Sequence, residues 1–536
     1  MTTQADKEAA DRRASDREAV TGEADAEQPN RDESNRESGD AGVGAEQRQP
    51  SDLFRRTRSG IAHHLGPAAA VFVLVAGVFG IVFATIIPPF WGHDEITQFG
   101  RAYQVAHGGF TPERITDDRG VSYGGQIPLS VDGLMGYAFT DYNRHPTEPA
   151  PLAADETAYD RLGSAPVTTT ATKQMWFTNT AAYSPVPYVP AAVGIRLAQA
   201  IGLDVGDTVL LTRLAGLLAY LVIVAFALRA LRTFRIQWLV FTIAVLPIAL
   251  FQAGTVTADT VTNALAVLVS CLVVKGVFLD TRLTKAEVVA ALAATLALPL
   301  SKPTYVILAM LVVLIPARQY GFGRVLRWLP WCFAALGAIL FAVWMKIAAP
   351  TGDGMGLMRK PSEWRSVRPG DQLHGILSDP VHFANTFGDS IWYRDEKWFI
   401  QFFGELGFAY VDVPALSILA CLLALAVSAG IADRLTGNRW RTWIVALTVL
   451  ASVAMIYVTL YMSFTPVGYW MIDGVQGRYF VPLAIAGFAV LLRWMPLRLS
   501  DSRGVTPVRG PAITVVVATV VALAAAAIKY NVLIWG

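Results

Sequence analysis

Long apolar stretches are the feature of this sequence that most restricts its fold. A helix needs about 20 consecutive, mostly apolar residues to cross the roughly 30 Å hydrocarbon core of a bilayer, and tilt or local thinning accommodates somewhat shorter ones. Hydrophobic residues make up 54% of the chain and charged residues 16%. Candidate spans lie at 67–87, 208–229, 236–253, 257–279, 286–301, 303–317, 328–349, 410–432, 441–463, 478–495 and 511–528. The sequence therefore predicts an all-α polytopic membrane protein with about eleven transmembrane helices.

The segment 183–203 is also apolar, but the distribution of basic residues argues against a further span. Short loops on the cytoplasmic side of a membrane carry an excess of Lys and Arg. If Arg55 and its neighbours hold the amino end inside and 183–203 does not cross, the short outside loops keep only Lys302 and Arg478. Counting 183–203 as a span would invert every later loop. We therefore expect it to form an interfacial helix on the outer surface.

This topology divides the chain into a tail, a membrane domain and two large loops. The first 52 residues contain no aromatic residue and more acidic than basic residues, so segment 1–60 is expected to be a disordered, acidic cytoplasmic tail. The membrane domain is expected to cover 67–528. Its two long polar loops, 88–207 and 350–409, fall on the extracytoplasmic side, so we expect the functional site there.

The first outer loop begins with a proline-led turn that runs into a helical pattern over residues 88–103. Asp94 and Arg101 share the polar face of that helix. In one interpretation Asp94 is simply the N-cap, and Glu95 is a favourable charge in the first turn. In the other, one of these carboxylates removes the proton from an attacking hydroxyl group. The pattern leaves both interpretations open.

Charged residues in or beside membrane helices are costly, so each is a candidate for a functional role. Arg478, with Tyr479 beside it, starts the span 478–495, and its guanidinium suits a phosphate group because it can donate two parallel hydrogen bonds. Its alternative role is to extend toward the interface. Lys302, between two apolar stretches, could supply a second positive charge or be an ordinary loop lysine.

Other charged residues have equally divided interpretations. Asp259 either caps the start of its helix or binds an acceptor or metal ion. Glu405 follows Gly404, which permits a close backbone approach, and could bind substrate hydroxyl groups. Arg213 either pairs with a carboxylate or extends to the interface. Hard oxygen ligands for a divalent cation could come from four residues, although no spacing demands a metal: Asp94, Glu95, Asp259 and Glu405.

Short motifs follow one another along most of the chain after residue 67. They are Pro88-Pro89, Asp94-Glu95, Arg101-Ala102-Tyr103, Tyr183-Ser184-Pro185, Tyr188-Val189-Pro190, Thr255 to Asp259, Lys302-Pro303-Thr304-Tyr305, Phe403-Gly404-Glu405-Leu406-Gly407 and Gln476-Gly477-Arg478-Tyr479-Phe480-Val481-Pro482. Together they resemble the motifs of a bacterial family called domain of unknown function 2142. That family usually has a histidine a few residues after the acidic pair, whereas here His93 precedes the pair and Gln98 follows it.

Members of that family resemble the GT-C superfamily of integral-membrane glycosyltransferases. The resemblance implies a helical membrane body, an acidic base in the first outer loop and a polyprenyl-phosphate-linked sugar donor. It makes Asp94 the expected base, with Glu95 as its partner or substitute, and makes Arg478 and Lys302 the expected phosphate ligands. Further substrate contacts are expected from Arg101, which could instead orient Asp94, and from Asp259, Glu405 and Tyr479.

The sequence thus predicts an inverting glycosyltransferase of the bacterial cytoplasmic membrane, acting on an envelope glycan or lipid at the extracytoplasmic face. We expect this activity to need no cofactor, although it is compatible with a divalent cation, and we expect no nucleic-acid partner. The alternatives are a transporter or flippase for lipid-linked glycans and a noncatalytic protein of envelope assembly. Transport predicts charges deep within several helices, whereas the charges found here gather at one face.

Overall fold

A computed structural model describes residues 65–143, 155–359, 361–363, 366–407, 411–495 and 508–536. All of these residues belong to a single unit of the chain, Arg56–Gly536. The predicted acidic tail, residues 1–60, lies outside the described residues.

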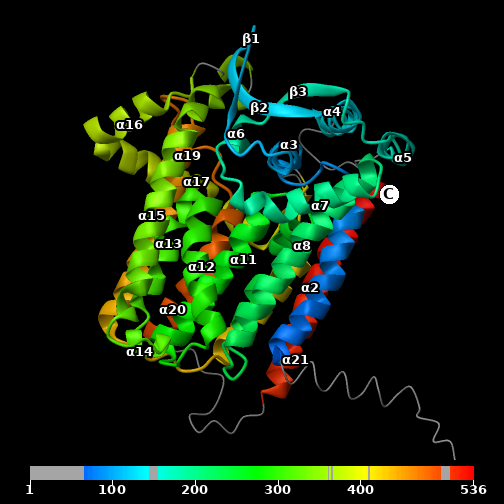
Figure 1. Ribbon diagram of the computed structural model, residues 1–536. Coiled ribbons are helices and arrows are strands. Elements are labelled where there is room, and N and C mark those ends of the chain that lie inside the picture. Colours follow the sequence, from blue (N-terminus) through cyan, green and yellow to red (C-terminus); the bar gives the residue numbers. More distant parts are fainter. Residues whose placement is uncertain (1–64, 144–154, 360, 364–365, 408–410, 496–507) are drawn as a thin grey trace, which may run out of the picture. The chain divides into compact units, whose positions relative to one another are not determined.

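The described part of the chain is mainly helical, as predicted, and contains seven helical segments long and apolar enough to cross a membrane. Figure 1 shows them running alongside one another. They are α2 (Pro67–Ile86), α8 (Val205–Ala230), α11 with the turn after it (Ala258–Phe278), α15 with the turns at its ends (Leu326–Leu357), α19 (Arg439–Ser463), η8 with α20 (Gly477–Phe480 and Val481–Trp494) and α21 (Arg509–Trp535). The protein is therefore a membrane protein with several apolar helices.

The other four predicted spans are helical too, but each is shorter than a full span. The span predicted at 236–253 breaks before Pro247, because proline lacks an N–H donor and disfavours helical geometry in the residue before it. The elements in these four regions are α9 (Gln237–Ala244) and α10 (Pro247–Ala253), α12 (Lys285–Ser301), the short helices of Pro303–Leu314 followed by α14 (Ala317–Tyr320), and α18 (Ala415–Gly430). The structure thus supports seven of the eleven predicted spans at full length.

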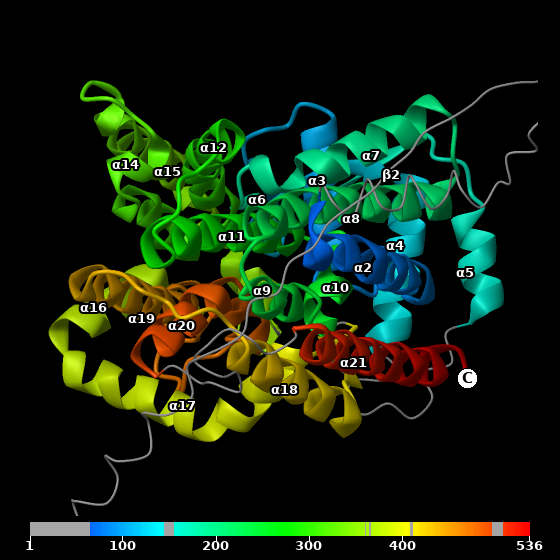
Figure 2. The ribbon, with the colours of Figure 1, turned by 90° about the horizontal axis from the view of Figure 1, so that it is seen from below.

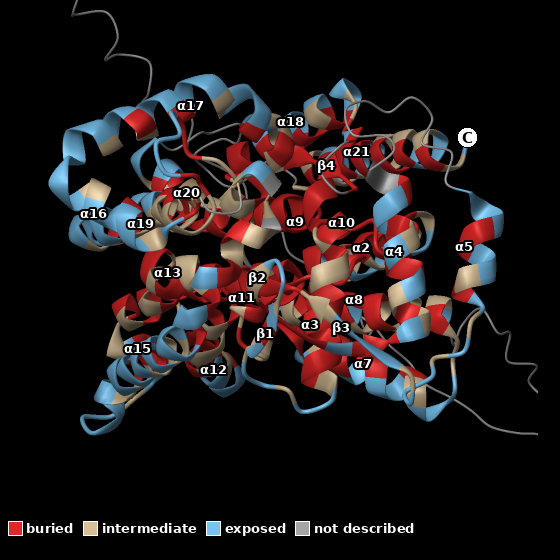
Figure 3. Ribbon diagram, turned by 90° about the horizontal axis from the view of Figure 1, so that it is seen from above, coloured by how far each residue is buried: buried red, intermediate tan, exposed pale blue. Residues whose placement is uncertain are grey.

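Helix α11 is surrounded by other helices. It packs against α8, α12 and α20, every one of its residues is buried, and Figures 2 and 3 show it enclosed between α12 and α20. Its sequence explains this position, since its residues are apolar or small and polar on all sides. Any charged group near the start of α11 is therefore carried into the interior.

The first outer loop is an α/β layer beyond one end of the spanning helices (Figure 1). Its elements are α3 (Glu95–Ala106), β1 (Glu113–Asp117), β2 (Gly120–Pro128), α4 (Leu129–Asn143), α5 (Glu156–Gly163), β3 (Thr172–Trp176), α6 (Thr178–Ala181) and α7 (Val189–Ala200). The strands form an antiparallel sheet in the order β1-β2-β3, which the all-α prediction did not include. Helix α7 has 12 residues, too few to cross a bilayer, in agreement with the interpretation of 183–203 as a segment that does not cross.

The second predicted loop, 350–409, is mostly helical. It contains α16 (Pro369–Ser378) and α17 (Pro380–Phe403), followed by the strand pair β4 (Glu405–Leu406) and β5 (Val411–Asp412). Helix α17 exposes large aromatic side chains, including Trp392 and Tyr393. Such residues are typical of helices at a membrane interface.

A buried ion pair connects α3 to the membrane helices. Arg213 of α8 donates from Nε and Nη2 to the two carboxylate oxygens of Glu95, at 2.8 and 2.6 Å, and the two side chains are 2% and 0% exposed. The guanidinium also donates three hydrogen bonds to carbonyl groups at the end of α2, so all five of its N–H donors are used. Glu95 additionally accepts from the backbone N–H groups of Gly92 and Val256. Arg213 therefore pairs with a carboxylate, and Glu95 fixes the start of α3.

The substitution Glu95→Gln is expected to lower the free energy of unfolding by about 3–5 kcal/mol, because it leaves the buried Arg213 charge without its partner. The unfolding temperature of the detergent-solubilised full chain measures the effect. Arg196→Gln, which changes an exposed arginine on α7, is the matched control and should leave that temperature unchanged. Equal unfolding temperatures for Glu95→Gln and the unsubstituted protein would show that this pair does not fix α3.

Candidate functional site

A close contact between two backbone segments determines where Arg478 lies. The turn η8, which precedes α20, packs against α17. A Cβ atom at Gly477 would lie 2.1 Å from the carbonyl oxygen of Trp398, so only glycine permits this approach. Gln401 of α17 accepts a hydrogen bond from the backbone N–H of Gly477 at 2.9 Å. These contacts fix the backbone immediately before Arg478.

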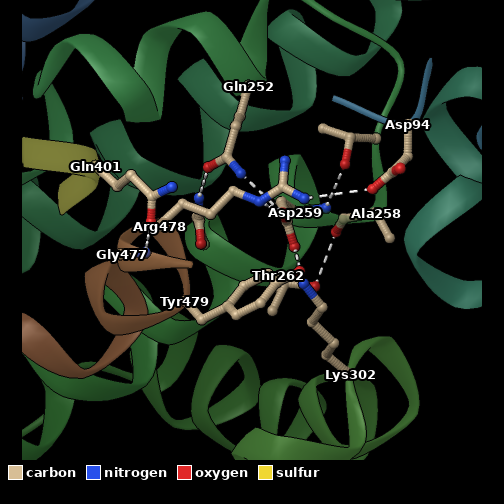
Figure 4. A network of polar contacts seen from close by, with 12 residues as sticks. Asp94, Gln252, Ala258, Asp259, Thr262, Lys302, Gln401, Gly477, Arg478 and Tyr479 are labelled. Atoms are coloured by element: carbon tan, nitrogen blue, oxygen red, sulfur yellow. Dashed lines mark hydrogen bonds and ion pairs between the residues drawn. The ribbon is translucent and has the colours of Figure 1, made fainter. Parts of the chain in front are cut away.

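The Arg478 guanidinium lies between two carboxylates (Figure 4). Its Nη2 atom is 3.3 Å from Oδ2 of Asp94, and its Nε atom is 3.8 Å from Oδ2 of Asp259. The side chain is 5% exposed, yet its Nε and Nη1 atoms have no hydrogen-bond partner among the described residues. An unsatisfied buried donor costs about 1–3 kcal/mol. Because Nε faces the Asp259 carboxylate, the geometry favours an anionic acceptor at Nη1.

Asp259 is held in place by three partners besides Arg478. Its carboxylate accepts hydrogen bonds from Gln252, at 2.8 Å, and from Lys302. The side chain of Gln252 is itself fixed by Asn263, which donates to it at 2.9 Å. The side chain of Thr257 caps α11 by accepting from the backbone N–H of Asp259. Asp259 is thus not the capping side chain, and its carboxylate joins two cations.

Tyr479 lies against both cations of the site. Its ring centroid is 4.5 Å from Nζ of Lys302 and 5.3 Å from Cζ of Arg478. A cation over the face of an aromatic ring is stabilised by the ring quadrupole. The sequence-predicted residues Asp94, Arg478, Asp259 and Lys302 therefore form a row of alternating charges, and Tyr479 covers its two cations.

Asp94 is the accessible member of this row. Its side chain is 40% exposed, and its backbone adopts a left-handed conformation with φ of 53°. Asp94 occupies the N-cap position of α3, as one interpretation predicted, but within the described residues its side chain makes no capping hydrogen bond. Left-handed geometry in a residue other than glycine is uncommon and often occurs at functional sites. Here it accompanies a carboxylate that faces Arg478 and solvent.

His93 lies next to this row but is enclosed. It is 4% exposed, and its ring packs edge-on against Phe251. Burial, and then the positive charge of Arg478, lower the pKa of His93 well below its ordinary value, while a backbone hydrogen bond to Glu405 acts in the opposite direction. The ring is therefore neutral at physiological pH.

Glu405 supports the site indirectly. Its carboxylate accepts from Gln401 at 2.5 Å and lies 3.6 Å from Nζ of Lys397. Because Gln401 also accepts from Gly477, Glu405 orients the side chain that holds the turn before Arg478. Burial raises the pKa of Glu405. The contacts place it as a positioning residue.

Arg101 does not lie in the row of charges, contrary to the expectation that it orients Asp94 or contacts phosphate. It is fully buried, and all five of its N–H donors are used. Nε and Nη2 donate to the carbonyl of Tyr183, Nη2 also to that of Phe110, and Nη1 to Gln104 and Gly109. Its role is to hold the first outer loop together. The helical periodicity placed Arg101 on a polar face but could not show that loop carbonyl groups surround it.

Two residues of the site were missed by the sequence analysis, Gln252 and Asn263. Both are amides within apolar stretches, which was a usable signal because a buried polar side chain needs a partner. The expected oxygen ligands for a divalent cation are dispersed, since Glu95 and Glu405 are committed to other partners. Across the described ranges, no group of three or more His, Cys, Asp or Glu residues is placed to hold a metal ion.

A family model described as predicted membrane protein (DUF2142) matches residues 78–486. The match covers more than half of the chain, so the protein belongs to this family, as its short motifs predicted. No curated protein and no solved structure matches the chain.

The stability of the protein is expected to fall as pH decreases below about 6.5 because of His93. In the unfolded chain this histidine takes up a proton near its ordinary pKa of 6.5, whereas burial keeps the folded ring neutral. His93→Gln should therefore flatten the dependence of the unfolding temperature on pH between 5 and 7. His374→Gln, at an exposed position of α16, is the control.

Glu405 provides a check of opposite sign. Because the pKa of Glu405 is raised, the folded protein keeps the proton of this carboxyl group at pH values where the unfolded chain has lost it. The contribution of Glu405 to stability is therefore lost as pH rises above about 4.5. Glu405→Gln should steepen the same pH profile that His93→Gln flattens. A His93→Gln profile identical to that of the unsubstituted protein would contradict this description of the ring.

Proposed function

We propose that this DUF2142 membrane protein is an inverting glycosyltransferase of the GT-C type. It transfers a sugar from a polyprenyl-phosphate donor to a glycan or lipid acceptor at the extracytoplasmic face of the bacterial cytoplasmic membrane. One observation carries the proposal. A buried arginine with two unused donor atoms lies beside a half-exposed carboxylate, so a phosphate ligand and a general base are available within one site.

The comparison of three buried arginines supports a ligand at Arg478 in particular. Arg213 and Arg101 each use all five N–H donors on protein acceptors. Arg478 donates to Asp94 and leaves Nη1 without a hydrogen-bond partner among the described residues. A guanidinium presents its donors in a planar fork that matches the oxygen atoms of a phosphate group. Nη1 of Arg478, which has no hydrogen-bond partner among the described residues, is therefore suited to an oxygen atom of the carrier phosphate.

The chemical step follows from the neighbours of that phosphate. An acceptor hydroxyl attacks the anomeric carbon, the bond between that carbon and the phosphate oxygen breaks, and Asp94 takes the hydroxyl proton. Polyprenyl phosphate leaves with the bonding electron pair. Arg478 stabilises the negative charge that develops on it, and Lys302 adds a second positive charge to the site. A single displacement inverts the configuration at the anomeric carbon.

The position of the charges supports surface chemistry over transport. Asp259 lies in the first turn of α11, Lys302 directly follows α12, and Arg478 lies in the turn before α20. These are the helix ends that meet the first outer loop through Asp94. A transporter for lipid-linked glycans would instead use polar groups along the length of the helices.

Transfer by the purified full-length protein in liposomes tests the proposal. The donors are radiolabelled polyprenyl-phosphate monosaccharides, and membrane lipids with envelope glycans serve as acceptors. Asp94→Asn should reduce the transfer rate by about 100- to 10,000-fold, because it removes the base while preserving shape. Asp118→Asn, which changes an exposed acid of the same loop, should retain the original rate.

Arg478→Gln separates the role of the phosphate ligand from that of the base. It should weaken donor binding as well as slow transfer, whereas Asp94→Asn should leave donor binding intact. Full activity of a folded Asp94→Asn protein would refute the assignment of the base. If no donor is transferred but the unsubstituted protein moves a labelled polyprenyl-phosphate sugar across the bilayer, the protein is a flippase and the enzymatic proposal is wrong.

A further inference from the structure

A cavity lies at the other end of α20, away from the row of charges. Its volume is about 340 Å³, and it is lined by Arg439, Thr442, Trp443, Arg493 and Trp494. Arg478 lies at the start of the α20 segment and Trp494 at its end. At a rise of 1.5 Å per residue they are roughly 24 Å apart along the helix. This cavity therefore belongs to the opposite membrane surface.

The described residues of the lining carry only positive charge. Two of these five residues are arginines, and none is acidic. Asp433, in the loop that precedes α19, accepts a hydrogen bond from the backbone N–H of Ile236 at 3.0 Å and is used there. A concave site with two guanidinium groups suits a phosphate-bearing anion.

Arg493 is held in place but incompletely satisfied. Its Nη2 atom donates to the carbonyl of Gly437 at 3.2 Å, which connects the end of α20 to the loop before α19. Its Nε atom is buried and has no hydrogen-bond partner in the described part of the chain. Arg493 therefore resembles Arg478 in having a buried donor atom without an acceptor.

Two features identify the anion as part of a lipid. Trp443 and Trp494 stand with their ring centroids 4.8 Å apart and are exposed, as is usual for tryptophan at the level of lipid headgroups. From Trp443, the exposed residues Leu447 and Leu450 continue along one side of α19 at helical spacing. A headgroup in the cavity would thus have its acyl chains against this apolar stripe.

We propose that this cavity binds the phosphodiester headgroup of an anionic membrane phospholipid. On the predicted topology it lies in the cytoplasmic leaflet, where basic pockets between helices bind anionic headgroups. The site is separate from the proposed transfer site and does not depend on it. A bound lipid would join α19 to α20 at this end, as Asp94, Arg478 and Asp259 join α20 to α3 and α11 at the other.

Native mass spectrometry of the full-length protein in detergent tests this site, with equal amounts of phosphatidylglycerol and phosphatidylcholine added. The protein should retain phosphatidylglycerol preferentially. Each arginine that contacts the bound headgroup is expected to contribute roughly a fivefold preference for anionic lipid, so Arg439→Gln with Arg493→Gln should lower the retained phosphatidylglycerol by about 25-fold relative to phosphatidylcholine. Arg327→Gln, beside Trp328 at another exposed helix start, should leave the preference unchanged.

The single substitution Arg439→Gln keeps the test decisive if the change at Arg493 prevents folding, because Arg439 is exposed and should still cost about fivefold. Glycerol 3-phosphate, added without lipid, separates the two sources of phosphate. Arginine-dependent binding of glycerol 3-phosphate as tight as that of phosphatidylglycerol would overturn the lipid assignment in favour of a soluble phosphate compound. Unchanged lipid preference in the folded variants would overturn the site itself.

Discussion

The contact of Arg478 with Asp94 and Asp259 is the interaction on which this end of the helix bundle depends. The row formed by Asp94, Arg478, Asp259 and Lys302 joins α3, α20, α11 and α12, which are far apart in the sequence. Buried charges are tolerated only where opposite charges or hydrogen bonds compensate them. Each element must therefore present its charged residue at this one point. The close approach of Gly477 to α17 fixes that position for α20.

Hydrogen bonding is complete at two of the buried arginines of this protein and incomplete at the third, Arg478. Arg213 and Arg101 satisfy every donor with protein acceptors. Arg213 holds the first outer loop onto the bundle, and Arg101 holds that loop together. Arg478 is equally enclosed yet leaves two donor atoms unused among the described residues. A structural arginine gains nothing from unused donors, whereas one that binds an anion needs them. The same contrast separates Glu95, with all its contacts internal, from the accessible Asp94.

The apolar stretches predicted where helices lie but not how long each helix is. The span predicted at 236–253 is divided at Pro247, because proline breaks the helical hydrogen bonds of the turn before it. The length of an apolar stretch does not reveal this local effect. The three-stranded sheet was missed because the central strand, β2, is held by hydrogen bonds to β1 and β3. The sequence of β2 alone does not show these partners. Arg478, Asp259 and Lys302 could be chosen as candidates from the sequence, because placing a charged side chain at the end of a membrane helix costs free energy. Their pairing was not predictable, since it joins residues separated by long stretches of chain. The same is true of the pairing with Arg213 that buries Glu95 and leaves Asp94 the accessible carboxylate.

An experimental structure of the full-length protein with polyprenyl phosphate tests the main claim most directly. Cryo-electron microscopy in a lipid nanodisc would locate the phosphate relative to the guanidinium of Arg478. We predict a phosphate oxygen at about 2.7–2.9 Å from Nη1 of Arg478, with Asp94 still accessible beside it. A phosphate bound at another place, with Nη1 of Arg478 still without an acceptor, would contradict the account.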